Sequence, residues 1–135
     1  MNKWTRRSLV LGITTAAVPV LAFGAGKLWC QTNIVQRAQI RSLSPLMAMY
    51  TDAHAAAALG ERYLCQTAST ALGALERLQA NEQLRRAAAT GCPLETALVA
   101  QQACREDFRT SRIYCIDGWV LAQTELDVAA LFTVA

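Results

Sequence analysis

The sequence predicts a mainly α-helical protein, a small antiparallel helical bundle that can end in a short C-terminal β-hairpin. Apolar residues recur at helical spacing between about residues 45 and 109. Short stretches of turn-forming residues separate these periodic segments, which favours antiparallel neighbours. One Asp-Gly pair lies between two β-favouring runs near the end. We expect a single helical domain over residues 44–135, a linker or short helix over 27–43, and a different kind of segment over 1–26.

The first 26 residues have the layout of an export signal. Arg6 and Arg7 follow Thr5, and the run from Leu9 to Gly26 contains no charge. This segment resembles twin-arginine (Tat) signal peptides, in which a hydroxyl residue precedes two arginines and bulky apolar residues follow one position later. The resemblance makes Arg6, Arg7 and Leu9 the targeting residues. A plain transmembrane anchor, for which about 20 apolar residues suffice, and a Sec signal remain open alternatives.

The resemblance implies export through the Tat translocase to the periplasm. Two small-x-small stretches, residues 20–22 and 22–24, are weak cleavage sites. If neither is cut, the segment anchors the protein to the cytoplasmic membrane.

Positive charge is concentrated in the targeting region. Lys3, Arg6, Arg7 and Lys27 are four of the 13 basic residues, so nine arginines face ten acidic residues in the rest of the chain. Because that remainder is almost neutral, the sequence gives no electrostatic support for nucleic-acid binding.

Five cysteines are many for a short exported chain, since an oxidising compartment favours disulfides. Two disulfides can form among Cys65, Cys92, Cys104 and Cys115, and the spacing does not fix the pairing. The chain has no C-x-x-C motif and one histidine, so we expect no metal site. It also lacks phosphate-binding, dinucleotide-binding and nucleophile-elbow motifs, so we expect no cofactor and no catalytic residues.

The first helix of the domain is predicted over residues 45–66. Ser44 is placed to cap it and Pro45 to begin it. Three small residues on its apolar face would let another helix approach closely; they are Ala53, Ala57 and Gly60.

A second helix is predicted from Leu72 to Gly91, with Leu72, Leu75 and Leu78 on its apolar face and Arg77 on its polar face. Pro93 opens a third helix that ends near Arg109. The apolar side of this third helix is formed by Leu94, Leu98, Cys104 and Phe108.

Asp117 and Gly118 predict a two-residue hairpin turn, because a type I′ turn needs positive φ at both positions. We expect Trp119 to pack on the bundle together with Ile113 or Ile116. The alternative is that Asp117 caps a helix beginning at Gly118. A last helix is predicted over residues 125–132.

The C-terminal third resembles a group of short Tat-exported bacterial proteins without an established activity. The resemblance rests on Asp107-Phe108, Arg112, Asp117-Gly118-Trp119-Val120-Leu121 and Thr124-Glu125, with Leu59-Gly60 and Tyr63-Leu64 in the middle of the chain. That group usually has Gly in place of Ser111 and Ser in place of Ala122. The first change disfavours a sharp turn before the hairpin, and the second removes a helix cap.

Two interpretations of the charged C-terminal residues follow. Asp107, Arg112, Asp117 and Glu125 could gather around Trp119 as an acid/base or ligand-binding cluster, since neighbouring carboxylates shift one another's pKa. The interpretation we favour is structural: Asp117 and Gly118 form the turn, Glu125 begins a helix, and Arg112 pairs with a carboxylate.

The Tat route carries folded cargo, often with a cofactor inserted, yet this chain has no cofactor motif. We therefore predict an exported, non-catalytic accessory or small subunit that binds a larger periplasmic or membrane-bound partner, with an oxidoreductase the first choice. Its architecture is similar to the small Tat-exported subunits of membrane-bound sugar and gluconate dehydrogenases. The alternatives are a free-standing structural or binding protein of the envelope, and a small thiol redox protein or enzyme using Cys104 or Cys115.

Overall fold

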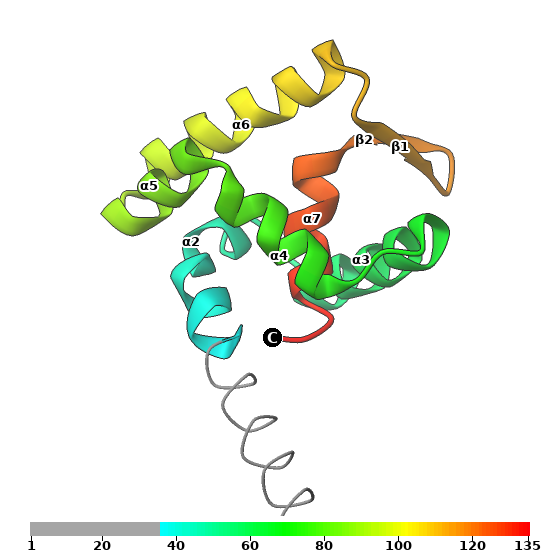
Figure 1. The fold of residues 1–135 in the computed structure, drawn as a ribbon, viewed down its shortest axis with the longest axis horizontal. Helices are drawn as coiled ribbons and strands as arrows, with labels where there is room; N and C mark the ends of the chain where they lie inside the picture. Colours follow the sequence, from blue (N-terminus) through cyan, green and yellow to red (C-terminus); the bar gives the residue numbers. More distant parts are fainter. Residues whose placement is uncertain (1–35) are drawn as a thin grey trace, which may run out of the picture. The chain divides into compact units, whose positions relative to one another are not determined.

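Helix α7 (Gln123–Leu131) lies at the centre of the fold, with the other elements around it (Figure 1). It packs against α3 (Ala53–Thr67), α4 (Ala71–Ala80), α6 (Pro93–Arg109) and α2 (Ser44–Met47). Six consecutive residues, 126–131, are buried. The last helix therefore supplies the centre of the hydrophobic core.

The structure is a computed structural model that describes residues 36–135. The predicted mainly α-helical fold is confirmed, and its one sheet is a two-stranded antiparallel hairpin of β1 (Ile113–Ile116) and β2 (Trp119–Ala122). The Tat-like segment with Arg6, Arg7 and Leu9 lies outside the described residues, as does Cys30. Within 36–135 no helix combines the length and apolar character needed to cross a membrane.

One compact unit covers Arg37–Ala135. It begins earlier than the expected domain, because Ile40 and Leu43 from the linker or short helix are buried in the core beside α2. Residues 36–42 are helical.

The prediction of one continuous helix over residues 45–66 is wrong. The chain forms α2 and then starts again at α3, because the Asp52 carboxylate accepts hydrogen bonds from the backbone N–H groups of His54 and Ala55 at 2.9 and 3.0 Å. These bonds satisfy two N–H groups at a helix start. A local cap thus divides a stretch whose apolar spacing is helical throughout.

The second predicted helix is also two helices, α4 and α5 (Glu82–Thr90). Asn81 adopts an extended conformation between them, and its side chain accepts a hydrogen bond from the Leu84 backbone at 3.2 Å. The predicted apolar face is only partly correct, since Leu75 and Leu78 are buried whereas Leu72 is 47% exposed.

Close packing between α3 and α7 depends on Gly60. A β-carbon at this position would lie 2.5 Å from the Ala129 carbonyl oxygen and 2.8 Å from the Ala130 α-carbon. Both contacts are to backbone atoms of α7, which cannot move aside as a side-chain end could. The predicted close helix pair at Gly60 is confirmed.

The hairpin has the predicted turn. Asp117 and Gly118 have φ values of 52° and 84°, and the strands pair with Ile116 opposite Trp119. Ile116 is buried, as expected, but the expectation that Trp119 packs on the bundle is wrong, because its side chain is 73% exposed. Trp119 directly follows the two turn residues, Asp117 and Gly118.

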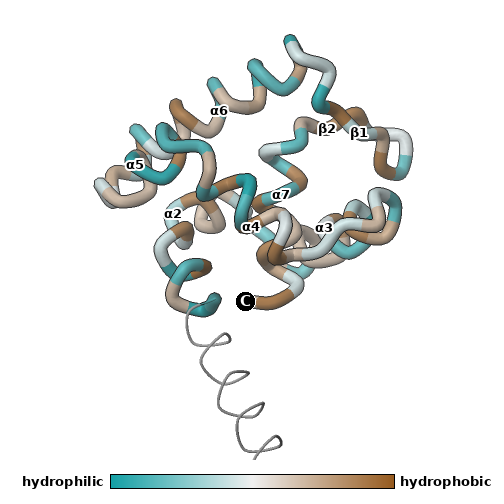
Figure 2. The backbone as a smooth tube through the Cα atoms, in the orientation of Figure 1, coloured by the Kyte–Doolittle hydropathy of each residue, from teal (hydrophilic) through white to brown (hydrophobic). Residues whose placement is uncertain are grey.

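Helix α6 has the predicted bounds, but the side that was predicted to face the core is largely exposed. Its buried residues are Thr96, Ala100 and Asp107. The leucines and the phenylalanine of the predicted apolar side point outward and are exposed. Figure 2 shows apolar stretches along α6, which runs along one edge of the fold.

Candidate functional site

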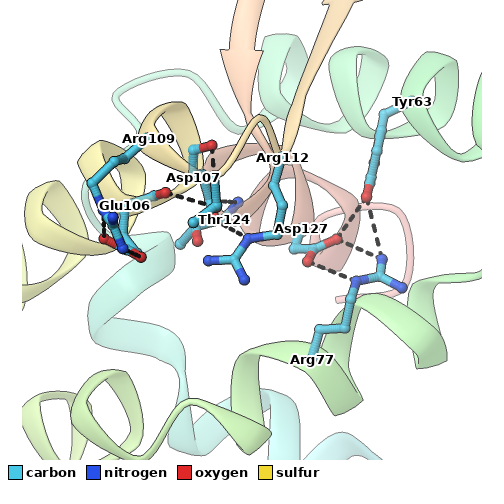
Figure 3. Close-up of polar contacts among 9 residues, drawn as sticks. Tyr63, Arg77, Glu106, Asp107, Arg109, Arg112, Thr124 and Asp127 are labelled. Atoms are coloured by element: carbon cyan, nitrogen blue, oxygen red, sulfur yellow. Dashed lines mark hydrogen bonds and ion pairs between the residues drawn. The ribbon is translucent and has the colours of Figure 1, made fainter.

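A buried carboxylate in the middle of α7 forms the first of two polar networks (Figure 3). Asp127 is 2% exposed. Its two oxygens accept hydrogen bonds from Arg77 Nε and Nη2 at 2.9 and 2.6 Å, and the Tyr63 hydroxyl donates to Oδ1 at 3.0 Å. The network ties α3 and α4 to the central helix.

Burial is the main influence on these groups. It raises the pKa of the Asp127 carboxyl, against the effect of the hydrogen bonds and charge supplied by Arg77 and the hydrogen bond from Tyr63. Burial likewise raises the pKa of the Tyr63 hydroxyl, and the neighbouring Asp127 charge adds to this rise. The pKa of Arg77 is raised chiefly by its hydrogen bonds to Asp127. Burial and hydrogen bonding thus act in opposite directions on the pKa of the Asp127 carboxyl, and Arg77 favours its charged form.

The sequence prediction missed this network. Arg77 was assigned to a polar face, yet its side chain is only 38% exposed. The available signal was Asp127 itself, a single acid inside the otherwise apolar run 126–131. An ionised residue at such a position needs a partner.

The second network joins the end of α6 to the start of α7. Asp107 is 3% exposed. Its Oδ1 accepts a hydrogen bond from Arg112 Nε at 2.9 Å, and its Oδ2 accepts one from the Thr124 backbone N–H at 2.7 Å. Because Ala122 gives α7 no side-chain cap, Asp107 provides a cap from a distant part of the chain.

These networks suit a structural role better than a catalytic one. No buried side-chain nitrogen or oxygen in residues 36–135 lacks a hydrogen-bond partner. Each oxygen of the two buried carboxylates already accepts a hydrogen bond from the chain, and satisfied buried networks fix a single packing arrangement.

The remaining predicted site residues lie apart from Asp107 and Arg112. Asp117 pairs with Arg62 at the surface, and Gly118 occupies the turn. Trp119 is exposed. Glu125 is in the first turn of α7, where its backbone carbonyl accepts a hydrogen bond from the Tyr50 hydroxyl at 2.7 Å. Of the expected cluster around Trp119, the structure brings together one pair only, Asp107 and Arg112.

The cysteines of the described region carry free thiols, so the disulfides considered for Cys65, Cys92, Cys104 and Cys115 are not formed. Twelve helical residues separate Cys92 from Cys104, about 18 Å along α6, far beyond disulfide reach. Burial, followed by the charge of Glu125, raises the pKa of Cys104 to about 11. Nowhere in residues 36–135 do three potential metal ligands gather at one place.

A groove of about 690 Å³ lies between α2, α6 and α7. Leu46 and Met49 line one side, Leu94 and Leu98 the other, and Val128 and Glu125 of α7 also contribute. Burial raises the pKa of the Tyr50 hydroxyl in this groove, and the Glu125 charge raises it further. The groove thus combines apolar walls with one negative charge.

Further large apolar side chains are exposed on α6 and on the hairpin. We name Leu94, Leu98 and Phe108 the outer stripe of α6; their exposed fractions are 70%, 58% and 51%. Trp119 and Val120 expose further apolar area on the hairpin. Large apolar side chains exposed on a small domain are candidates for an interaction surface.

Comparison with known proteins provides no relative from which a function could be transferred. No family model, curated protein or solved structure matches the chain. A functional assignment therefore depends on the residues described above.

Proposed function

We propose that this chain is an exported, non-catalytic accessory subunit that binds a larger protein, an oxidoreductase, at the periplasmic side of the cytoplasmic membrane. The observation that carries the proposal is the outer stripe of α6, three large apolar side chains exposed on a helix whose opposite side packs in the core. Burying such side chains against a partner is favourable by about 25 cal/mol per Å² of apolar area.

The buried networks support the same proposal. Their carboxylates serve to hold α3, α4 and α6 on α7. The domain is therefore well suited to present a fixed surface. Export as a folded complex would follow from the Tat-like segment, and the cofactor would belong to the partner.

Purification of the full-length protein from its native membrane tests the proposal. We expect one larger, cofactor-bearing protein to accompany it at a fixed ratio. The variant Leu94→Ser/Leu98→Ser should retain its fold but lose this protein, because it removes exposed apolar side chains only. A lone protein after gentle extraction would contradict the subunit proposal and favour a free-standing envelope protein.

Export is tested separately. Replacing Arg6 and Arg7 together by lysine should leave the protein in the cytoplasm if the Tat route is used, whereas Sec export would tolerate this change. The assay is fractionation of cells followed by immunodetection.

The thiol redox alternative makes a different prediction for Cys104. With a pKa of about 11, its thiolate fraction at pH 8 is roughly two-hundredfold below that of an ordinary thiol with a pKa of about 8.5. Cys104 should thus be alkylated far more slowly than exposed Cys65 in the native protein, measured by mass mapping. Rapid selective alkylation of Cys104 would favour the redox alternative.

A further inference from the structure

We propose that the groove between α2, α6 and α7 binds a helix of the partner protein, with apolar side chains against the groove walls and a lysine or arginine against Glu125. The inference rests on the proposed function and specifies which element of the partner docks and where.

The groove walls would supply the apolar contacts to the partner helix. Leu94 and Leu98 are one helical turn apart and strongly exposed, and Met49 is exposed on the opposite side. Buried Leu46 and Val128 also line the groove. An amphipathic helix presents apolar residues at positions i, i+3, i+4 and i+7, the pattern that fits such a groove.

Glu125 would supply the charged contact to the partner helix. It lines the groove and forms no ion pair with any residue between 36 and 135. Its charge reaches both Tyr50 and Cys104, since it raises the pKa of each. Asp52, Glu61, Glu76 and Glu95 also lack an arginine partner within residues 36–135, but none of them lines the groove. A carboxylate without a counter-charge in an apolar groove is complementary to a basic residue of a docked partner.

The groove is accessible enough for a helix. Its volume of about 690 Å³ is partly open to solvent, and exposed Leu94 and Leu98 form one wall. A helix has a diameter of about 10 Å with its side chains, and it would cover the two leucines while remaining part of a larger protein.

Site-specific photo-crosslinking locates the docked element. The photoreactive residue p-benzoylphenylalanine replaces Leu98 in the full-length protein, expressed in the native host. The matched control replaces Leu72 of α4, which is exposed to a similar extent but lies outside the groove. We expect position 98, and not position 72, to crosslink to a helical peptide of the copurifying protein that contains a lysine or arginine.

Charge reversal tests the role of Glu125. We expect Glu125→Lys to reduce the recovered partner about tenfold and Glu125→Gln to reduce it about threefold, because like charge opposes the basic residue and an amide only removes the attraction. Glu61→Lys is the control, since Glu61 is exposed on α3 outside the groove. Unchanged circular dichroism of each variant separates binding from folding.

The outcomes separate the inference from the proposed function. If the partner copurifies but position 98 does not crosslink to it, the groove inference is overturned and the subunit proposal stands. Crosslinking of position 98 to a second copy of this chain or to lipid alone also overturns the inference. If no partner copurifies at all, the proposed function itself fails.

Discussion

Helices α6 and α7 each bury an aspartate, Asp107 and Asp127, but they place their large apolar side chains in opposite ways. Central α7 buries an aspartate, Asp127, among leucines and alanines. Peripheral α6 exposes Leu94, Leu98 and Phe108. Position in the fold, rather than residue type, thus decides what is buried, and the exceptions on each helix have different consequences.

The buried charge on α7 has partners within the described part of the chain, whereas the exposed leucines of α6 are not covered there. Arg77 and Tyr63 surround the Asp127 carboxylate with donors. No residue in the described part of the chain covers Leu94 and Leu98, which are both largely exposed. Residues of α7 should therefore control stability, and the exposed residues of α6 should control binding.

The sharpest test compares one leucine on each helix. Leu126→Ala should lower the free energy of unfolding by about 3 kcal/mol, because it opens a cavity in the core; Leu126 is fully buried. Leu98→Ala should change it by no more than about 0.5 kcal/mol. Urea unfolding followed by circular dichroism measures both. Equal losses would show that Leu98 also belongs to the core.

The buried charge on α7 should matter next. Asp127→Ala removes the partner of Arg77, and we expect a loss of about 2 kcal/mol. This is below the 3–5 kcal/mol typical of a broken buried pair because Arg77 retains access to water. Arg62→Ala, which removes the exposed partner of Asp117, is the control and should cost about 0.5 kcal/mol or less. A neutral Asp127→Ala in the same unfolding assay would refute the structural role of the network.

A smaller effect is expected where α3 meets α7. Gly60→Ala places a methyl group 2.5 Å from the Ala129 carbonyl oxygen, and overpacking costs about 1–3 kcal/mol, partly offset by the helix preference for alanine. The expected net loss is about 1.5 kcal/mol by thermal unfolding. At Gly73 the same change meets its nearest atom at 3.4 Å and should stabilise the protein slightly. A stabilised Gly60→Ala variant would rule out the close approach.

Local signals explain what the sequence predicted correctly. Pro93 fixed the start of α6, and Asp117 with Gly118 fixed the hairpin turn, because the backbone preferences of these residues act at the residue itself. Their positions required no knowledge of the rest of the fold. Element type and several bounds were therefore predictable.

Local signals could not predict which face of a helix is buried or which residues pair across long stretches of sequence. Helix α6 has apolar residues on both sides, with Val99, Ala100 and Ala103 packed in or against the core, so its periodicity does not say which side is buried. Asp107 caps α7 across 17 positions of sequence. Such partners become visible only once the chain is folded.

The smallest predicted effect concerns the junction where the chain leaves α6 for the hairpin. The Arg112 N–H donates to the Asp107 carbonyl at 2.8 Å, and Ser111 has a φ of 59°. This arrangement at a helix end favours glycine in the left-handed position, because a β-carbon is strained there. Ser111→Gly should stabilise the protein by about 0.5 kcal/mol, since relief of strain outweighs the added freedom of the unfolded chain.

Ser111→Ala keeps the β-carbon and removes the hydroxyl, so it separates strain from hydrogen bonding and should not stabilise the protein. Both variants are compared by urea unfolding. If the alanine variant gains as much as the glycine variant, backbone strain at Ser111 is not the cause. If the glycine variant loses stability instead, the junction owes its rigidity to serine, and the link between the exposed face of α6 and the buried α7 depends on that side chain.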